Sequence, residues 1–226
     1  MLVARQEIAR NILKRVGIVL IIVGCVDIAL MIYCIATETS YGSSLNVFAI
    51  VAGIFLIRGS LRAAKIVSDF SAFLAATCTA LIVALPIFVP INFIVTLFRI
   101  EPTKTVAYAA LMFLIIALLW WVHAKVSSVP VVAALKEADL RLYRRIWSIL
   151  AGVALVTFLV VFIAAAQRSE SAKAQLTKIE REHGSHQRYF FSEYRAKGGG
   201  GKSVINATIV GYTSDSIRAY EVSWEE

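Results

Sequence analysis

The residue in this sequence whose type and position most strongly suggest a chemical role is Asp27, which lies in the middle of an apolar run from Val16 to Ile35. An aspartate at the centre of a membrane helix costs about 2.5–3.5 kcal/mol on the insertion scale, and each Leu, Ile or Val around it returns about 0.3–0.6 kcal/mol. The run is therefore expected to enter a bilayer with the carboxyl group of Asp27 either paired or protonated. The default interpretation of such a group is a functional one.

Three threonines are expected to lie at the same depth in the membrane as Asp27 and could form one polar layer with it. At a rise of about 1.5 Å per residue, Asp27 lies about 16 Å from the inner end of its helix. Thr77, Thr79 and Thr157 fall at a similar depth in later apolar runs. A proton or cation site is one interpretation, and a layer of interhelical hydrogen bonds, worth about 0.6 kcal/mol each, is the other. The second is favoured, because no other acid or base accompanies Asp27 at this depth.

Two further matches to chemical motifs are weak. Residues 196–203 fit a relaxed phosphate-binding loop, but β-branched residues follow them where such a loop needs the start of a helix. His183 and His186 supply two imidazoles, whereas zinc takes three or four protein ligands. The sequence also lacks paired carboxylates and a Ser-His-Asp set. We therefore expect no enzymatic activity, no cofactor and no metal site.

The composition places these residues in a membrane. Of the 226 residues, 59% are hydrophobic and 17% are charged, and the mean hydropathy is +0.75. A soluble domain averages about 45–50% apolar and about 25% charged residues, so an integral membrane protein is expected. The net charge of +8 is interpreted as a topology signal. No nucleic-acid partner is expected, because no soluble domain with a basic face stands out.

The apolar runs predict a transmembrane helical bundle over residues 16–166, between a basic N-terminal segment (1–15) and a polar tail (167–226). A spanning helix needs about 20 apolar residues. The predicted spans are about 16–35, 41–57, 66–89, 106–122 and 146–166. The second reaches a spanning length only if it starts near Tyr41. The alternative is a run that dips into the bilayer and returns to the same side.

The distribution of Lys and Arg favours five spans. With the N-terminus in the cytoplasm, twelve of these cations lie on the inner side, and only Arg99 and Lys104 lie in the short outer loops. If the second run only dips in, six lie inside and eight outside. The positive-inside rule therefore predicts a cytoplasmic N-terminus and an extracytoplasmic tail, in the inner (plasma) membrane of a bacterium. Removal of the first run as a signal peptide is disfavoured, because its length exceeds the roughly 7–15 residues of a signal core.

Small residues recur at a spacing of four on two of the predicted helices. They are Ala72, Ala76, Ala80 and Ala84 in the third run, and Ala49 and Gly53 in the second. Because small residues let helix backbones approach closely, these stripes predict a close pairing of the second and third helices.

The loop before the last span is predicted to hold a short amphipathic helix near residues 131–145. Arg141, Arg144 and Arg145 would form a basic patch on the inner leaflet, facing anionic lipid. A docking face for a cytoplasmic protein is the alternative.

The tail is predicted to begin with a helix that prolongs the last span through residues 167–183 and stops at Gly184. Strand-like runs at 188–194, 204–210 and 217–224 then predict a three-stranded antiparallel meander. So small a sheet is marginal alone, and needs the helix, the membrane face or another protein to cover its apolar side. The third strand carries Tyr220, Val222 and Trp224 on one face and has an unpaired edge.

These features lead to two hypotheses about function. The first is a non-enzymatic accessory, assembly or scaffold protein that presents the last strand, with Tyr220, Val222 and Trp224, to a protein partner. The alternative is a small transporter or channel subunit that uses Asp27 as its proton or cation site. The sequence does not specify the oligomeric state.

Overall fold

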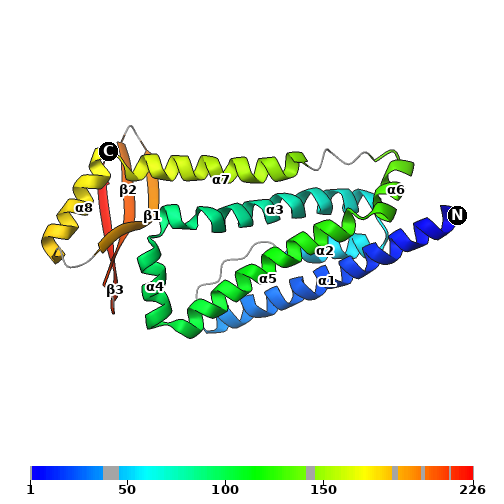
Figure 1. Ribbon diagram of the computed structural model, residues 1–226, viewed down its shortest axis with the longest axis horizontal. Coiled ribbons are helices and arrows are strands. Elements are labelled where there is room, and N and C mark those ends of the chain that lie inside the picture. Colours follow the sequence, from blue (N-terminus) through cyan, green and yellow to red (C-terminus); the bar gives the residue numbers. More distant parts are fainter. Residues whose placement is uncertain are drawn as a thin grey trace. The chain divides into compact units, whose positions relative to one another are not determined.

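The computed structural model describes residues 2–37, 46–140, 146–184, 188–199, 202–213 and 215–225. It is mostly helical, with one small antiparallel sheet near the C-terminus (Figure 1). Among the described residues, four helices are long and apolar enough to cross a membrane: Gln6–Ala36, Leu61–Phe88, Pro102–Val126 and Ile146–Ala165. The apolar helices and the small antiparallel sheet agree with the coarse prediction from the sequence.

The residues divide into two compact units. The first combines Met1–Thr77 with Ile115–Gly152, and the second combines Cys78–Leu114 with Val153–Glu226. Three long helices contribute to both units, namely α3 (Leu61–Phe88), α5 (Pro102–Val126) and α7 (Ile146–Gln167).

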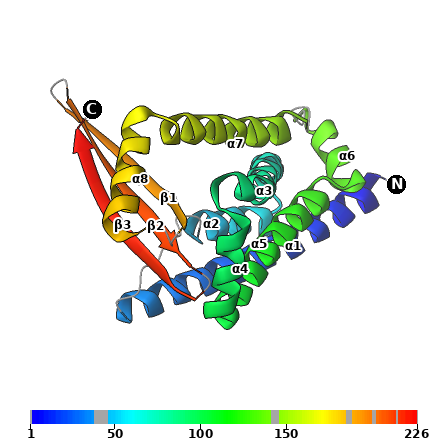
Figure 2. The same cartoon turned by 60° about the vertical axis from the view of Figure 1, so that its left-hand side comes forward.

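In the first unit, α1 (Leu2–Ala36) and α2 (Asn46–Ile57) pack side by side (Figure 2). A Cβ atom added to Gly17 would lie 2.6 Å from the carbonyl oxygen of Gly53, so the two backbones are in contact. The prediction that Gly53 brings α2 closely against α3 is therefore wrong, because its partner is Gly17 of α1. A small residue permits a close approach without specifying which helix approaches.

Helix α2 is short for a membrane span. Its 12 residues extend about 18 Å at a rise of about 1.5 Å per residue, whereas the hydrocarbon core of a bilayer is about 30 Å thick. Residues 41–45 of the predicted second span lie outside the described part of the chain, so this span stays a prediction. The helix ends at Ile57, and the turn after it contains Gly59, which has a φ of +76° and whose N–H donates to the carbonyl of Leu56 at 2.9 Å.

The core of the first unit joins the start of α1, the end of α2, the start of α3, the end of α5 and the short helix α6 (Val129–Glu137). Its buried members include Ala9, Leu13, Val16, Leu56, Ala64, Val67, Val122, Val126, Val131 and Leu135. Three stretches of the chain that are distant in sequence, residues 9–16, 52–67 and 122–135, therefore meet in this core. The same stretches carry many of the basic residues that flank the apolar runs.

Helix α6 differs from its predicted form. It ends at Glu137, and its apolar residues Val131 and Leu135 are fully buried in the core of the unit. The prediction that this segment lays its apolar face into lipid is corrected, because the ends of neighbouring helices cover that face. Arg141, Arg144 and Arg145, predicted as a basic patch, lie outside the described residues.

A second close approach in the first unit joins α3 to the start of α7. A Cβ atom added to Gly152 of α7 would lie 2.7 Å from the carbonyl oxygen of Phe73 and 2.9 Å from the hydroxyl oxygen of Thr77. Ala72 and Ala76 of the predicted alanine stripe are buried in this part of α3. In the second unit Ala84 is buried and Ala80 is half-buried, as is Ala49 in the first unit.

The sheet belongs to the second unit and has the strand order β1-β2-β3. Strand β1 covers Arg188–Gly199, β2 covers Lys202–Tyr212 and β3 covers Ile217–Glu225. All pairs are antiparallel, which makes the sheet a meander, as predicted. The register of β1 on β2 shifts between Phe191 and Glu193, whereas β3 pairs with β2 without interruption from Ile217 to Glu225.

Helix α8 (Glu170–His183) covers one face of the sheet (Figures 1 and 2). It is a separate helix, and the prediction that it prolongs α7 is corrected. The hydroxyl of Ser169 caps its first turn by accepting from the N–H of Ala172 at 3.3 Å. Gly184 ends it with a φ of +94°, as the sequence predicted. Buried Ala172 and Ile179 of α8 pack in one core with residues of all three strands, namely Phe191, Ile205, Ala207, Ile209 and Trp224.

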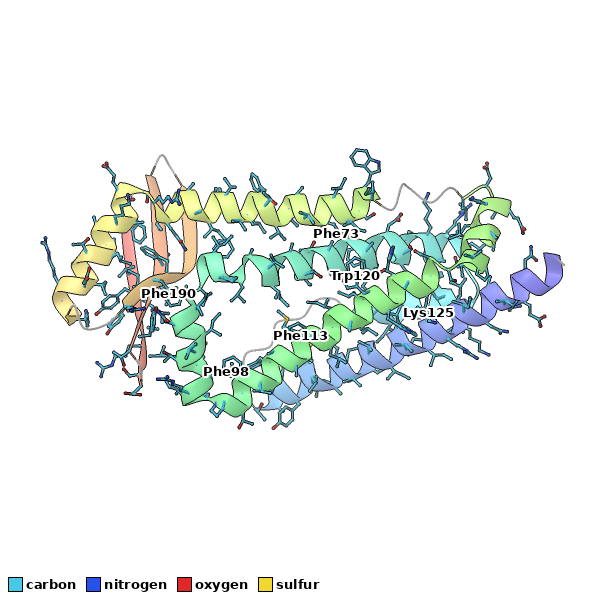
Figure 3. The ribbon with its side chains drawn as sticks, viewed as in Figure 1. Phe73, Phe98, Phe113, Trp120, Lys125 and Phe190 are labelled. Carbon is cyan, nitrogen blue, oxygen red and sulfur yellow. The ribbon has the colours of Figure 1, made fainter. Side chains whose placement is uncertain are left out.

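The short helix α4 (Ile91–Ile100) packs on the other face of the sheet, at one end. Its Phe93 ring lies 4.9 Å from the Phe190 ring and 5.5 Å from the Tyr212 ring, measured between centroids. Figure 3 places Phe190 beside α4. The Thr96 hydroxyl also reaches the carbonyl oxygen of Thr213 at 3.2 Å. Helix α4 and the sheet are thus joined by an aromatic cluster and a polar contact.

Candidate functional site

One cluster of polar residues in the first unit lies between α3 and the end of α5. The buried hydroxyl groups of Ser68 and Ser127 lie 2.9 Å apart. The Nδ1 atom of His123 lies 3.1 Å from the carbonyl oxygen of Ser68. Since a carbonyl can only accept, Nδ1 must carry the proton of this hydrogen bond. This cluster therefore links α3 to α5 through satisfied hydrogen bonds.

Asp69 adds charge to this cluster, and sequence reasoning missed it. Its half-buried carboxyl group interacts electrostatically with Lys65 and His123. The spacing of four between Lys65 and Asp69 was a usable signal, because such pairs face each other on a helix. No spacing links either residue to His123, which lies on a different helix. In this cluster the negative charge of Asp69 is balanced by the positive charge of Lys65. Such a composition is typical of a structural contact between helices.

The predicted intramembrane layer is divided between the two units. Asp27 and Thr77 belong to the first, and Thr79 and Thr157 belong to the second. The Thr77 hydroxyl donates to the carbonyl of Phe73 at 2.8 Å, and that of Thr157 donates to Val153 at 2.9 Å. Both threonines therefore satisfy their hydroxyl within their own helix. Asp27 is half-buried on α1, and its role as an ion site stays a prediction.

The predicted partner-binding residues of the tail lie in strand β3. Tyr220, Val222 and Trp224 of β3 pair with Ile209, Ala207 and Ile205 of β2, on the face that α8 covers. Trp224 is buried there, and Tyr220 and Val222 are half-buried. These three side chains serve the tail's own core. On the opposite face of the same strand, Ala219, Glu221 and Ser223 are exposed.

The connection between α8 and β1 is also held in place. The Tyr189 hydroxyl donates to the carbonyl of Gly184 at 3.0 Å. Burial raises the pKa of the Tyr189 phenol above its ordinary value. The His183 ring lies 4.3 Å from the Tyr220 ring, between centroids. The end of α8 is thereby fastened to β3 as well as to β1.

In comparisons with known proteins, no family model, no curated protein and no solved structure matches the chain. The fold defines the class to which it belongs. It is a helical chain with four helices of membrane-spanning length and composition among the described residues, followed by a small C-terminal sheet with its own core.

Proposed function

We propose that this chain is a non-enzymatic integral membrane protein that offers its C-terminal sheet to a protein partner, as an accessory or assembly component. The observation that carries the proposal is the outer edge of β3. This strand has nine residues, pairs with β2 without a bulge, and lies at the end of the strand order in the described sheet. A regular edge of this kind is a template for an added strand.

The two edges of the sheet differ in how well they suit an added strand. Strand β1 has a register shift between Phe191 and Glu193 and contacts α8. A bulge disrupts the ladder and twists an edge away from further pairing. Strand β3 has neither a bulge nor a proline. The partner is therefore expected to bind β3 through backbone hydrogen bonds, with selectivity from the exposed side chains of Ala219, Glu221 and Ser223.

The proposed orientation places the tail outside the cytoplasm. In the first unit, the start of α1, the start of α3 and the end of α5 meet at one end, and each carries Lys or Arg residues. The positive-inside rule assigns such an end to the cytoplasm. The chain then leaves that side through α7 and reaches the sheet on the other side, which in a bacterial plasma membrane is extracytoplasmic.

Reporter fusions test this orientation. Alkaline phosphatase, which is active only outside the cytoplasm, is expected to be inactive when fused after Lys65 or Glu137 and active when fused after the last residue. Green fluorescent protein at the same positions is expected to give the reverse pattern. Active phosphatase after Lys65, or inactive phosphatase at the C-terminus, would contradict the orientation.

The edge is tested with a pair of adjacent substitutions, Arg218→Pro and Ala219→Pro. Neighbouring residues of a strand point their N–H groups in opposite directions. The N–H of Thr213 donates to the carbonyl of Ser216 at 2.9 Å, so Arg218, two residues after Ser216, points its N–H toward β2, and Ala219 points its N–H outward. Ala219→Pro removes an outward donor and is expected to preserve the fold and abolish partner binding. Arg218→Pro removes a donor to β2 and is expected to lower the unfolding temperature. Partner binding is measured in native membranes by cross-linking from a photoreactive residue placed at exposed Ser223.

The control for this experiment is the same photoreactive residue at Lys178, which is exposed on α8. The expected result is one adduct from position 223 that the edge proline removes, and none from position 178. An adduct with twice the mass of the chain would show self-pairing instead of a different partner. Equal adducts with both prolines would contradict strand addition.

A further inference from the structure

A polar groove of about 440 Å³ opens in the second unit between α4 and the end of the sheet. Helix α4 contributes Asn92, Val95, Thr96 and Arg99, and the sheet and the turn after β2 contribute Arg188, Tyr212 and Thr213. The aromatic cluster of Phe93, Phe190 and Tyr212 holds these two walls together. The groove is thus built by tertiary contacts that join residues about 90 positions apart in sequence, such as Arg99 and Arg188.

The charged residues that line the groove are all basic. Arg99 and Arg188 come from two different elements, both are exposed, and none of the lining residues is acidic. Among the residues that the structure describes, no ion pair joins either guanidinium group to a carboxylate. A guanidinium group presents a planar fork of N–H donors that matches a phosphate group. The Asn92 amide adds a neutral donor to the same wall.

The two threonine side chains of the groove are already hydrogen-bonded. Thr96 contacts the carbonyl oxygens of Asn92 and Thr213 at 3.0 and 3.2 Å. The Thr213 hydroxyl lies 2.8 Å from the hydroxyl of Ser216. These contacts hold the walls in place and leave the two arginines as the charged groups for a ligand. Two cations that line one groove without an acidic residue favour an anionic ligand.

The position of α4 in the chain indicates the source of that anion. It connects α3 with α5, both of membrane-spanning length, and only a few residues separate it from either. Its apolar residues Ile91, Val95 and Phe98 are exposed at 65%, 45% and 43%. A short helix that follows one span, precedes the next and leaves apolar side chains uncovered lies at the surface of a bilayer. At that depth the nearest abundant anions are lipid headgroups.

We propose that the groove binds the phosphate group of an anionic phospholipid, held between Arg99 and Arg188. The lipid would bridge α4 and the start of β1 and so fasten the sheet to the bilayer surface. This inference does not depend on the partner proposed for β3, because the groove and the β3 edge use different residues.

The test uses the full-length protein in a nonionic detergent, with short-chain phosphatidylglycerol as the ligand and short-chain phosphatidylcholine as the neutral comparison. Bound lipid is counted by native mass spectrometry. Phosphatidylglycerol is expected to bind one molecule per chain, at least tenfold more tightly than phosphatidylcholine. Arg99→Gln or Arg188→Gln is expected to weaken that binding at least tenfold. The matched control is Arg218→Gln, which removes an exposed arginine outside the groove.

The variants separate loss of a ligand from loss of the fold. Thermal unfolding without added lipid is expected to be the same for the wild type and all three Gln variants. Arg99→Lys keeps the charge without the planar fork, so it is expected to weaken binding less than Arg99→Gln. Equal binding by Arg99→Gln, Arg188→Gln and Arg218→Gln would overturn the proposal. Displacement of the lipid by equimolar inorganic phosphate would overturn the lipid assignment and identify a site for free phosphate.

Discussion

Gly17→Leu is expected to lower the free energy of unfolding by about 3 kcal/mol, at the upper end of the range for overpacking. The reason is the contact between α1 and α2. An added Cβ on Gly17 would lie 2.6 Å from the Gly53 carbonyl oxygen and 2.9 Å from a side-chain carbon of Ile57. The closer of these atoms belongs to the backbone, which cannot rotate away as a side chain can. The whole of α2 must shift to admit the new side chain.

Thermal and denaturant unfolding of the purified protein in detergent measure this effect. Gly53→Leu is the reciprocal variant and is expected to behave in the same way, because its added Cβ would lie 2.7 Å from the Gly17 carbonyl oxygen. The control is Ala29→Leu, which also introduces a leucine, but at an exposed position of α1. If Gly17→Leu and Ala29→Leu unfold at the same temperature, the two backbones are not in contact.

Ile209→Ala is expected to unfold the tail while the membrane helices stay folded. Ile209 is fully buried in the core that α8 forms with the sheet. Removing a buried isoleucine side chain beyond Cβ costs about 2–5 kcal/mol. A unit as small as this helix and three strands has only about 3–5 kcal/mol of core stability to lose. The cost of one substitution is therefore comparable to the whole stability of the tail.

Hydrogen exchange of the backbone amides measures this outcome region by region. Protection of β1, β2 and β3 is expected to fall to the level of an unfolded chain, with protection of α3 and α5 unchanged. The matched control is Asn206→Ala in the same strand, at an exposed position on the opposite face. Full protection of the sheet in Ile209→Ala would show that the core between α8 and the sheet does not hold the tail together.

Local signals in the sequence were enough to predict the elements of the tail. The alternation of Tyr220, Val222 and Trp224 predicted a strand with one buried face, and the structure has β3 there. Gly184 predicted the end of a helix, where it has a positive φ. Length and apolar composition likewise predicted the long helices. These features depend on neighbours within a few residues, so a single segment contains the information.

The partner of each buried face was decided only by the tertiary structure. Gly53 packs on Gly17 of α1, Val131 and Leu135 of α6 are buried at helix ends, and α8 covers the apolar face of β3. The pattern of a segment identifies which face is to be buried, but burial of apolar surface is non-directional, so the pattern does not name the neighbour.

The sequence by itself therefore determined the long apolar helices of this chain, which could cross a membrane, and the strands of its tail. The tertiary structure alone decided which helices pair, and it alone brought Asp69 toward His123 and Arg99 toward Arg188. Each of these two pairs joins residues from different elements. No periodicity within one segment relates such residues, and only folding brings them within range of each other.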